Sequence, residues 1–524
     1  MKLIDPEAKS TIKTVCPFCS FGCEFGVVFD DFGVRGVEYL TEGNTGGRLC
    51  PRGSAAAFFL NHPHRLTIPV KKGRPVDWTK IKQDLRDILA RPEKVAVCFD
   101  RNITEEEYQA IISFCNNHGI THIVSTYFEP ERFLQRFIDG KKTLSLDQIE
   151  KSQMIIVLGD PFNQTPMLSK TLINWKLSDR KNRLVVIDSI NTHTSGFAND
   201  FLKVRVGTEP LILLTLAQEK IDGLDAPGVI GIDAGIIDEI SRSFKSAESG
   251  LIIASLAFGH TFDPFLLAES LDRLSKFSGK PVMPLFEFIG FSGNEHFGIL
   301  FNQIKKKKIK YLLNFGELFP YYYPQILKGT KGLEVYATST LKFDQMDGLP
   351  AALNLEKAGT FLTTFGRAKL NGEIRPTSGT MDIMTLLNMF GETASKVVLL
   401  KAPKLKIELG ARAGALVQRV MKKTKGYQLL GEKVAFNFMG FFERPQLKVN
   451  PKDGEELKIH TGDQVFVQSK HGRAELAVKL SADVPQGVVS IPAETPDVRG
   501  LFDFEIHQEL VNFVPTEVRI WKKE

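Results

Sequence analysis

The sequence predicts an α/β protein of several domains: a small N-terminal cysteine domain, two doubly wound α/β units and a C-terminal β-barrel. Three observations support this prediction. The 524 residues are too many for one core. Strand-like runs alternate with helix-like stretches through the middle of the chain, as in parallel sheets. Beyond about residue 440, short strand-like runs separated by turns replace the helices.

Four of the six cysteines lie near the N-terminus in the pattern C-x2-C-x3-C-x26-C. They are Cys16, Cys19, Cys23 and Cys50. Three closely spaced thiols can wrap one face of a small inorganic cluster, and a fourth can close the cage, so the set suits a [4Fe–4S] cluster. A structural zinc site also uses four cysteines, but such sites more often pair two C-x2-C knuckles. The second knuckle is missing here, and the spacing therefore favours iron–sulfur.

The remaining two cysteines, Cys98 and Cys115, are expected to be buried apolar side chains. Short β-like runs at 25–29 and 34–39 predict a small antiparallel sheet in the cysteine domain. A first Rossmann-like unit follows, with strands and helices in alternation. Its expected elements are a helix from Trp78 to about Ala90, a strand over 95–99, a helix over 105–117 and a strand over 121–126.

A second Rossmann-like unit is predicted from strands over 154–160 and 184–189, with a helix after Pro166 between them. Ligands of such sheets bind beyond the carboxyl ends of the strands, where the loops at 159–163 and 188–192 lie. Small residues with free backbone N–H groups suit a pyrophosphate there, although tight βα turns alone give the same pattern. The barrel is predicted from strands over 464–469, 474–480 and 487–492.

Composition limits the function classes. A hydrophobic share of 43% and a charged share of 24% are ordinary for a globular protein, and the net charge of +6 is spread along the chain, so no nucleic-acid partner is expected. The run 305–308 of lysines is expected to be a solvated segment before a strand. No apolar stretch reaches membrane-span length, and the start MKLIDPEAKS lacks an apolar signal region and twin arginines. We expect a cytoplasmic protein with no membrane span.

Phrases next to the fourth cysteine carry a family resemblance. LCPRG (49–53), FFLNHPHRLTIPV (58–70) and VDW (76–78) follow one another in order. Together with the cysteine pattern they resemble the molybdopterin oxidoreductase family, above all formate dehydrogenases and the large iron–sulfur subunit of respiratory complex I. The resemblance extends to later loops and to the block 337–367, which is similar to the family's "ADVVLP…E-x-x-G-T-x-x-N-x-x-G-R", with Thr363 where Asn is usual.

The resemblance implies a molybdopterin guanine dinucleotide cofactor holding molybdenum or tungsten, with the two α/β units each taking one arm. It also implies that Arg52 lies between the cluster and the pterin, and that Glu209, in place of the family's Asp, contacts the guanine. The cofactor-binding residues so implied are Arg52, Gly159, Asp160, Asp188, Thr192, Gly207, Thr208, Glu209, Gly316, Glu317, Gly359, Thr360 and Arg367. In the family's order the domains are a [4Fe–4S] cluster domain over 1–70, a discontinuous first pterin-binding-type domain over 71–135 and 345–440, a second α/β domain over 136–344 and a dinucleotide-binding barrel over 441–524.

The chain departs from the resemblance at one loop. Catalytic formate dehydrogenases carry Cys or selenocysteine and then His after the strand that corresponds to 121–126. Here the loop reads YFEPE (127–131) and has no Cys, Ser or His. Glu129 could ligate a hard metal through oxygen, although a solvated carboxylate is the simpler interpretation. The histidines His122, His193 and His260 are expected to be structural, and the catalytic residues stay unknown.

Two functions follow. The first is a formate dehydrogenase-like oxidoreductase subunit that passes substrate electrons to its cluster. The second is a non-catalytic electron relay and scaffold without molybdenum or tungsten, as in complex I. Because one cluster moves one electron at a time, either function implies other redox subunits, iron–sulfur or flavin proteins, in a hetero-oligomeric complex.

Overall fold

The computed structural model describes residues 10–16, 18–100, 103–125, 129–138, 144–221, 223–286, 291, 293–316, 330–342, 347–391, 408–422, 424–435, 444–493, 495–507 and 510–523. The chain forms two compact units, each built from several segments. Unit 1 comprises Met1–Tyr127, Glu287–Leu400 and Gln508–Leu510. Unit 2 comprises Phe128–Phe286, Lys401–His507 and Val511–Glu524.

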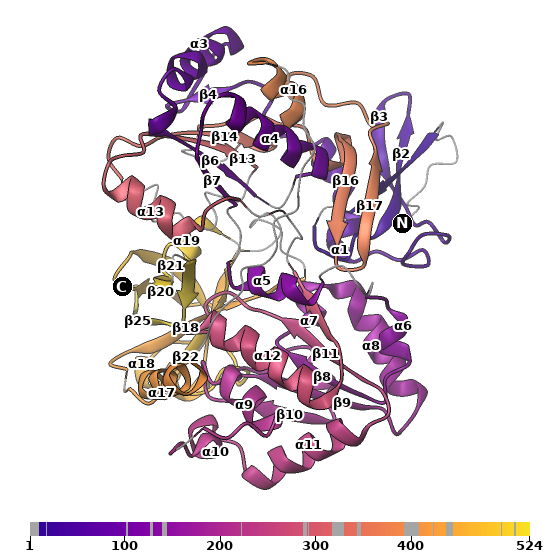
Figure 1. Ribbon diagram of the computed structural model, residues 1–524, viewed down its shortest axis with the longest axis vertical. Coiled ribbons are helices and arrows are strands. Elements are labelled where there is room, and N and C mark those ends of the chain that lie inside the picture. Colours follow the sequence, from indigo (N-terminus) through magenta and orange to yellow (C-terminus); the bar gives the residue numbers. More distant parts are fainter. Residues whose placement is uncertain are drawn as a thin grey trace. The chain divides into compact units, whose positions relative to one another are not determined.

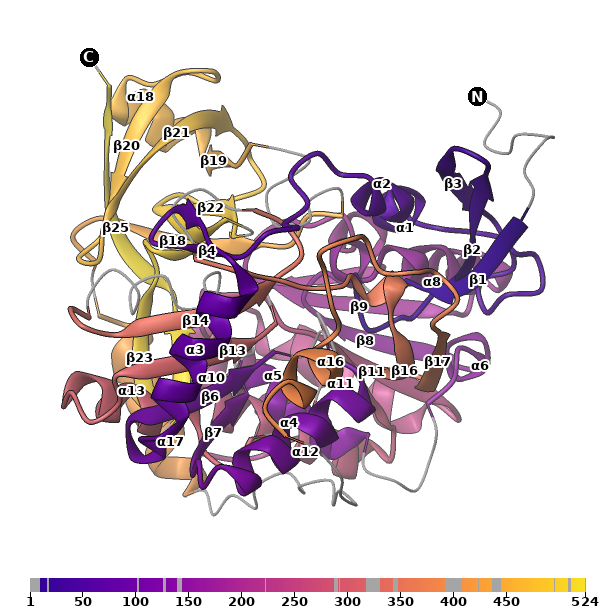
Figure 2. The ribbon, with the colours of Figure 1, turned by 90° about the horizontal axis from the view of Figure 1, so that it is seen from above.

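Unit 1 begins with an antiparallel sheet that carries the cysteines. Its strands are β1 (Ser10–Val15), β2 (Glu24–Asp30) and β3 (Gly33–Glu38), in the order β1-β2-β3. The middle strand β2 is buried on both faces, since Phe25 and Val27 on one face and Val28 on the other are all 0% exposed. Two short helices, α1 (Pro51–Ser54) and α2 (Ala56–Leu60), follow the fourth cysteine, and Figure 2 shows them near this sheet. The predicted small sheet is confirmed.

The main sheet of unit 1 is parallel and has the order β15-β14-β13-β6-β7. Its strands are β6 (Val95–Phe99), β7 (His122–Ser125), β13 (Tyr311–Phe315), β14 (Glu334–Ser339) and β15 (Leu349–Pro350). Its helices include α3 (Trp78–Leu89), α4 (Glu105–Asn117), α13 (Phe297–Lys305) and α16 (Ile383–Asn388). Strand β6 is entirely buried, as expected for the centre of a parallel sheet.

Three smaller features complete unit 1. The strands β4 (Val70–Lys71) and β5 (Arg74–Pro75) form a short hairpin. A longer hairpin joins β16 (Ala358–Thr363) to β17 (Gly366–Asn371). Figure 1 shows this orange hairpin beside the indigo N-terminal sheet, and the two share a buried cluster of Val15, Phe361 and Leu370. The hairpin thus ties a late part of the chain to the cysteine domain.

The α/β part of unit 2 is a second parallel sheet, in the order β10-β9-β8-β11-β12. Its strands are β8 (Met154–Leu158), β9 (Arg183–Asp188), β10 (Asp200–Lys203), β11 (Gly250–Ser255) and β12 (Val282–Leu285). Its helices are α5 (Glu129–Leu134), α6 (Asp147–Glu150), α7 (Pro161–Gln164), α8 (Pro166–Ser178), α9 (Glu209–Leu216), α10 (Ala226–Ile230), α11 (Ala234–Ser246) and α12 (Pro264–Ser278). Helix α9 is buried on nearly all sides, which matches its sequence EPLILLTL, in which five of the last six residues are Leu or Ile.

Unit 2 also contains a closed barrel in the order β18-β22-β19-β21-β20-β25. Its strands are β18 (Tyr427–Glu432), β19 (Gln446–Val449), β20 (Gln464–Gln468), β21 (Arg473–Leu480), β22 (Val488–Pro492) and β25 (Thr516–Lys522). The pair β23 (Asp503–His507) and β24 (Leu510–Val514) and the helices α17 (Leu409–Val420), α18 (Pro451–Leu457) and α19 (Pro496–Arg499) accompany it. Within its described part, the chain has no helix with the length and apolar character of a membrane span.

The predicted fold class is confirmed, but two domain boundaries differ from the prediction. Strands β13 and β14, expected in the second α/β domain over 136–344, pair in parallel with β6 in unit 1. Residues 409–432, expected in the first domain over 345–440, belong to unit 2: Arg412 Nη1 pairs with Asp263 Oδ2 at 2.7 Å, and β18 is a barrel strand. Pairing between strands far apart in the chain decides both boundaries, and no local pattern encodes it.

A buried ion pair yields a test of the packing in unit 1. Lys357 Nζ lies 3.0 Å from Glu107 Oε1, with both side chains almost fully buried. Lys357→Ala would leave the Glu107 carboxylate buried without its cation, so we expect the free energy of unfolding to fall by about 3–5 kcal/mol. Arg367→Ala in the neighbouring hairpin is the control, because its ion pair with Glu105 is surface-exposed and should contribute less than about 1 kcal/mol. Urea unfolding of both variants measures this, and equal losses would contradict the prediction.

Candidate functional site

The four N-terminal cysteines are all buried, although no disulfide joins them. Strand β1 ends at Val15, and the chain then turns back so that the Cys16 N–H donates to the Cys23 carbonyl at 2.8 Å. Cys50 stands directly before α1, as its N-cap residue. A Cβ on Gly53, in the next turn, would lie 3.7 Å from Cys16 Sγ, so the α1 backbone lies close to the thiols.

The thiols lie within electrostatic reach of one another and of Arg52. Burial raises the pKa of Cys16, Cys19 and Cys23, and neighbouring thiols of the set raise it further. The buried Arg52 guanidinium lowers the pKa of each of these three thiols. In the described part of the chain no group of three or more His, Cys, Asp and Glu side chains is arranged to hold a metal ion. A [4Fe–4S] cube bonds each thiolate to a different iron, so its ligands surround the cluster rather than meet at one ion.

The β16–β17 hairpin packs directly on the cysteine loop. Ser20 Oγ and Thr364 Oγ1 are 2.8 Å apart and buried, and the Thr364 N–H donates to the Ser20 carbonyl at 2.7 Å. A Cβ on Gly22 would overlap the Thr363 methyl group, and Gly22 has a φ of +67°. Thr363, which replaces the family's usual Asn, is therefore part of the wall of the cysteine loop.

Each of the two parallel sheets has one point where the order of its strands reverses. At each of these points lies a glycine that the sequence analysis expected to bind the cofactor. In unit 2 the reversal falls between β8 and β11, where Gly159 follows β8. Its φ is +86°, and a Cβ there would overlap the Ser255 carbonyl oxygen at the end of β11. In unit 1 the reversal falls between β6 and β13, where Gly316 has a φ of +127° and a Cβ would overlap the Asp100 carboxylate. Ligands of such sheets bind at these reversal points.

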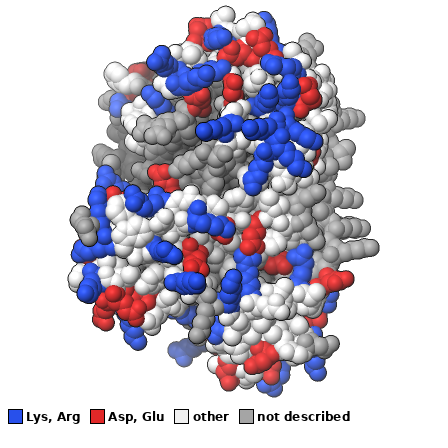
Figure 3. All heavy atoms as spheres, turned by 90° about the vertical axis from the view of Figure 1, so that its left-hand side faces the viewer, with Lys and Arg blue, Asp and Glu red and all other residues white. Residues whose placement is uncertain are grey.

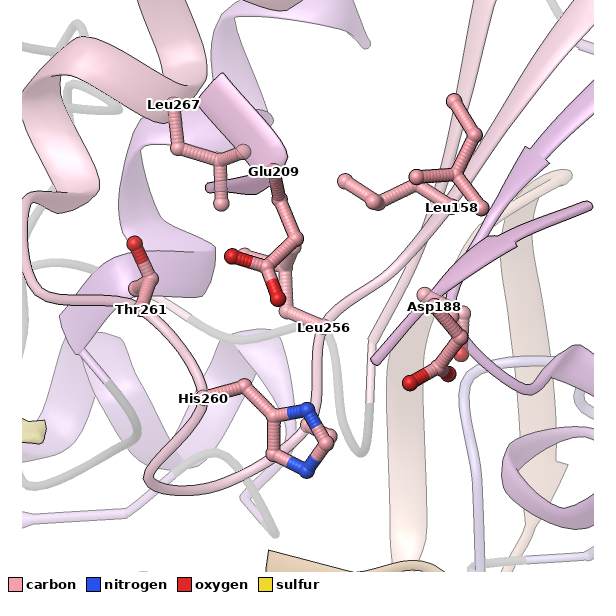
Figure 4. Close-up of a pocket in the computed structure, with 11 residues that line it drawn as sticks. Leu158, Asp188, Glu209, Leu256, His260, Thr261 and Leu267 are labelled. Carbon is pink, nitrogen blue, oxygen red and sulfur yellow. The ribbon is translucent and has the colours of Figure 1, made fainter. Parts of the chain in front are cut away.

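In unit 2 a pocket opens at this point, lined by Leu158, Gly159, Ile187, Asp188, Glu209, Ser255, Leu256, Ala257, His260, Thr261 and Leu267. Figure 4 shows Asp188, Glu209 and His260 directed into the same space. Neither carboxylate oxygen of Glu209 has a hydrogen-bond partner, although the residue is only 6% exposed. Such a group is costly unless a ligand supplies donors.

Burial perturbs all three of these titratable groups. It raises the pKa of Glu209 to about 8, with a smaller contribution from the Asp188 charge, although the nearby backbone N–H groups of Glu209 and Gly207 lower it in part. It also raises the pKa of Asp188 to about 7, with smaller contributions from the charges of Asp160 and Glu432. Asp188 Oδ1 accepts the Ser189 N–H at 2.7 Å, which partly offsets its desolvation. Burial lowers the pKa of His260 to about 4, and the neutral imidazole Nε2 donates to the Gly431 carbonyl at 2.8 Å. His260, expected to be structural, makes that bond and also lines the pocket.

A wider pocket continues from the first one and holds about 1250 Å³ of empty space, including the part open to solvent. The two share Asp188, Ser255, Ala257 and His260. The barrel contributes basic side chains that the sequence analysis did not single out: Lys433, Arg444, Lys448 and Lys479. Sheet and barrel residues thus meet around one space. Two carboxylates, Glu432 and Asp483, lie among its cations, and Lys448 Nζ pairs with Glu432 Oε2 at 2.7 Å.

Other predicted residues of unit 2 shape the loops around this space. Asp160 is held by Thr194 Oγ1, which donates to its Oδ1 at 2.5 Å, and burial raises its pKa. Thr192 Oγ1 accepts the Ser195 N–H at 3.1 Å and so closes the next turn. Gly207 has a φ of +82° and packs under the Phe262 ring, while Thr208 is the N-cap residue of α9 and presents Glu209 at its first position. Of these four, Asp160 and Thr192 line the wider pocket.

The predicted residues of unit 1 are placed differently. The Thr360 N–H donates to Glu106 Oε2 at 2.7 Å, Gly359 packs against the same carboxylate, and Arg367 pairs with Glu105 at 3.0 Å. The structure thus gives these three residues partners at the start of α4. Glu317 lies outside the described residues.

The loop that lacks a metal-ligand residue is described only in part. Residues 126–128 and the side chain of Glu129 lie outside the described residues. Glu131, at the end of this loop, is 0% exposed, and the Gln164 amide donates to its Oε1 at 3.4 Å. Ser255 Oγ donates to the other end of the Gln164 amide, so a buried polar chain connects the loop to the end of β11. Cys115, on α4, is also 0% exposed, and burial raises its pKa, as expected for an inert core thiol.

Two family models match the chain: the Molybdopterin oxidoreductase Fe4S4 domain over residues 9–62, and the Molydopterin dinucleotide binding domain over residues 440–513. The first match spans all four cysteines, and the second covers most of the barrel. The chain thus carries two domains of the molybdopterin oxidoreductase family, one near each end of the sequence.

Relatives extend these matches to most of the chain. The F420-dependent formate dehydrogenase subunit alpha of Methanocaldococcus jannaschii is 21% identical over 92% of this chain and 94% of its own length. The NADPH-Fe(3+) oxidoreductase subunit alpha of Geobacter sulfurreducens is 24% identical over 41% of this chain and 27% of its own length. Formate dehydrogenase H of Escherichia coli is 18% identical over 51% and 44%, respectively.

Among solved structures, acetylene hydratase from Pelobacter acetylenicus superimposes with a TM-score of 0.73 at 14% identity, covering 98% of this chain and 100% of that one. At this identity the likeness concerns the fold. The chain is an oxidoreductase of the molybdopterin family, similar to formate dehydrogenases and nitrate reductases.

The residues present fit the cofactors of this family. A guanine edge carries two adjacent N–H donors, and Glu209 offers two buried oxygens that have none. The four buried thiols beside a buried guanidinium fit a cluster whose negative charge needs compensation inside the protein.

The raised pKa of Glu209 gives a stability test of the cofactor-free chain. Because its folded-state pKa of about 8 exceeds the ordinary 4.5, the folded state binds this proton more tightly, so stability from this group is full at low pH and is lost as pH rises toward 8. Glu209→Gln removes that loss. We expect the variant to match the parent at pH 4.5 and to exceed it by about 3 kcal/mol at pH 7.5.

Urea unfolding of both proteins across this pH range measures the effect. Glu239→Gln is a matched control, since that carboxylate is half-exposed and paired with Arg183 at 2.6 Å. Parallel stability curves for the parent and Glu209→Gln would contradict the burial of an unpaired carboxylate.

The position of Arg52 gives a redox test. A positive charge near the thiols stabilises the reduced, more negative cluster, so Arg52→Leu should lower the cluster's midpoint potential. Arg52→Lys keeps the charge and should lower it less. Potentiometric titration followed by electron paramagnetic resonance measures both. A potential unchanged in Arg52→Leu would place this guanidinium away from the cluster.

Proposed function

We propose that this chain carries one [4Fe–4S] cluster on Cys16, Cys19, Cys23 and Cys50 and a molybdopterin guanine dinucleotide with molybdenum or tungsten, and that it passes substrate electrons to the cluster within a formate dehydrogenase-like redox complex. The observation that carries the proposal is the unpaired buried carboxylate of Glu209 at the reversal point of the unit 2 sheet. The relatives with "subunit alpha" in their names support the multi-subunit context.

The chain's own residues have separate tasks in this proposal. Glu209, with Asp188 beside it, would accept hydrogen bonds from the guanine, and Arg444 and Lys479 of the wider pocket would neutralise the phosphates, whereas Lys448 is already paired with Glu432 at 2.7 Å. Gly159 lets the turn after β8 pack directly on the end of β11, because any side chain there would strike the Ser255 carbonyl oxygen. When bound, the pterin-held metal supplies two-electron chemistry on the substrate, and the cysteine cluster accepts those electrons singly.

A second function is favoured by one observation. The loop over 127–131 has no Cys, Ser or His to ligate the metal, so the chain could also act as an electron relay and scaffold that holds a cluster without metal-centred catalysis. Metal and pterin content of the purified protein separates the two: iron with molybdenum or tungsten supports the first, and iron alone supports the second.

The cluster assignment predicts the effect of removing single thiols. Anaerobically purified protein should contain about four irons and matching acid-labile sulfide per chain. Cys50→Ser should lose much of both, because a ligand is removed, whereas Cys98→Ser should lose neither, since that thiol is buried in β6. Iron and sulfide assays, together with visible absorption spectra, measure the cluster content of each variant. One zinc per chain without sulfide would refute the cluster.

The altered loop predicts weak or absent formate oxidation by the isolated chain. Formate with an artificial electron acceptor measures turnover, alongside the metal and pterin content of the same sample. Robust turnover with stoichiometric molybdenum or tungsten would contradict this expectation. Glu129→Ala and Cys115→Ser would then identify whether an oxygen or a thiol ligand serves the metal.

A further inference from the structure

The amino ends of three strands in the unit 1 sheet carry a cluster of basic side chains. Strands β6, β13 and β14 run in parallel, with Val95, Tyr311 and Glu334 side by side at their starts. The Lys310 N–H donates to the Lys94 carbonyl at 2.9 Å, and the Glu334 N–H donates to the Lys310 carbonyl at 2.9 Å. The residues that precede the three strands are therefore neighbours, although they lie far apart in the sequence.

Three segments lead into these strands: 91–94, 305–310 and 330–334. We define the lysine edge as their basic residues, which are Arg91, Lys94, the lysine run 305–308, Lys310 and Lys331. All of them are exposed except Lys94, which is half-buried. Figure 3 shows the side of the molecule on which α13 lies in Figure 1, and basic side chains gather densely over its upper part.

The charge of the lysine edge is not neutralised by the carboxylates around it. Its members form no ion pair with a carboxylate of the described residues. The acidic residues in the same three segments are Glu93 and Glu334, and Glu334 lies 3.9 Å from the ammonium group of Lys71, outside the edge. The edge therefore carries an excess of positive charge that solvent or a partner must balance.

One lysine of the run has a backbone conformation that favours glycine. Helix α13 ends at Lys305, and Lys307 follows with a φ of +57°. The Lys307 N–H donates to the Ile304 carbonyl at 2.9 Å, and the Lys308 N–H donates to the Gln303 carbonyl at 3.0 Å, as in a Schellman motif. Glycine is the usual residue at this position, because a side chain strains the left-handed backbone. The chain thus has a charged residue where glycine would give a more stable fold.

Stabilisation of the α13 dipole explains only part of the lysine edge. Cations in the last turn of a helix interact favourably with its carboxyl end, and the effect falls off within that turn. It therefore covers Lys305 and Lys306. Lys94, Lys310 and Lys331 lie beyond the helix and gain nothing from its dipole.

The composition of the edge favours a bilayer with anionic lipids over other polyanions. Protein interfaces are depleted in lysine and depend on apolar or aromatic anchors, yet the three described segments expose no large apolar side chain. Single-stranded nucleic acids stack on exposed aromatic rings. Here Lys305 lies over the Phe301 ring at 4.3 Å, and Arg91 lies over the Tyr311 ring at 5.7 Å. Clusters of four to eight lysines and arginines are typical of sites that bind anionic lipid headgroups.

We propose that the lysine edge docks the protein on a membrane surface that carries anionic phospholipids. The headgroup phosphates accept hydrogen bonds from the lysine ammonium groups. The edge inserts no large apolar side chain into the hydrocarbon layer, so the contact is electrostatic and reversible. Ligands of parallel sheets bind at the carboxyl ends of the strands, whereas the edge lies at their amino ends, so docking leaves that ligand side free. The inference goes beyond the proposed function and does not depend on a bound cluster or pterin.

Vesicle sedimentation with the purified full-length protein tests the proposal. Vesicles of phosphatidylcholine and phosphatidylglycerol at about three to one are compared with vesicles of phosphatidylcholine alone. At low salt we expect binding to the mixed vesicles only. At about 0.5 M salt the protein should stay in the supernatant, because salt screens the attraction between exposed charges.

Two variants change the lysine run. The triple variant Lys306→Gln, Lys307→Gln, Lys308→Gln removes three exposed charges and should weaken binding about a hundredfold, at roughly fivefold for each lysine near an anionic surface. Lys307→Gly removes one charge and relieves the left-handed backbone, so it should weaken binding about fivefold while raising the melting temperature. Its folded state is thus expected to be at least as stable as that of the parent.

The matched control lies in unit 2. The triple variant Lys170→Gln, Arg180→Gln, Lys181→Gln removes the same net charge from exposed positions that form no ion pair with a described residue. Its binding to the mixed vesicles should match that of the parent. Thermal unfolding of every variant checks that the fold is kept.

Equal binding of the parent and the Lys306–Lys308 triple variant would overturn the proposal, as would an equal loss in the control. Binding to vesicles of phosphatidylcholine alone would also overturn it. A protein that ignores the mixed vesicles but binds a fluorescent oligonucleotide or polyglutamate through the lysine run would contradict the proposal, because the edge would then fit a nucleic acid or an acidic protein. None of these measurements requires iron, pterin or turnover, so their outcome is separate from that of the proposed function.

Discussion

The two buried oxygens of Glu209 are the constraint on which the site in unit 2 depends. A carboxylate without donors destabilises a fold, and this one is fixed at the first turn of α9 by Thr208 and by the positive φ of Gly207. The cost is offset only when a ligand brings N–H groups to it. Two neighbouring pockets meet here: Gly159 and the neutral His260 line the first, and His260 also lines the wider pocket, which carries the barrel cations. A buried carboxylate without donors does not stabilise the packing around it, so we explain the presence of Glu209 by ligand binding.

Much of the fold could be predicted because its central strands are short, uninterrupted apolar runs, as in 95–99 and 154–158, which the structure buries completely. The cysteine spacing and the glycines at 159 and 316 could also be picked out from the sequence, because each belongs to a short local pattern. The boundaries near 311–344 and 401–440 could not be predicted, because β13 pairs with β6, a strand that lies far from it in the sequence. Lys448 and Lys479 of the barrel could not be predicted as pocket residues either. Side chains alternate between the two faces of a strand, and this pattern does not show which face lines a pocket.

Motif residues need not all touch the cofactor. Glu209 and Gly159 border a space with unmet hydrogen-bonding capacity, whereas Thr360 and Arg367 have protein partners at the start of α4. Thr360 and Arg367 belong to the β16–β17 hairpin, which packs on the cysteine loop through contacts such as that of Ser20 with Thr364. Their place in the family's sequence pattern can therefore be explained by the packing of this hairpin. The loop over 127–131 is the opposite case, where a side chain needed for metal ligation is missing while the surrounding fold is kept.

The central claim is that the unit 2 crevice is built for a guanine nucleotide, whether or not the chain turns over a substrate. The most direct measurement is the guanosine monophosphate released when anaerobically purified protein is hydrolysed in acid and separated by chromatography. The account predicts at least stoichiometric guanosine monophosphate in the parent protein and a clear loss in Glu209→Ala. Full iron and sulfide content with no guanosine nucleotide in the parent would contradict it.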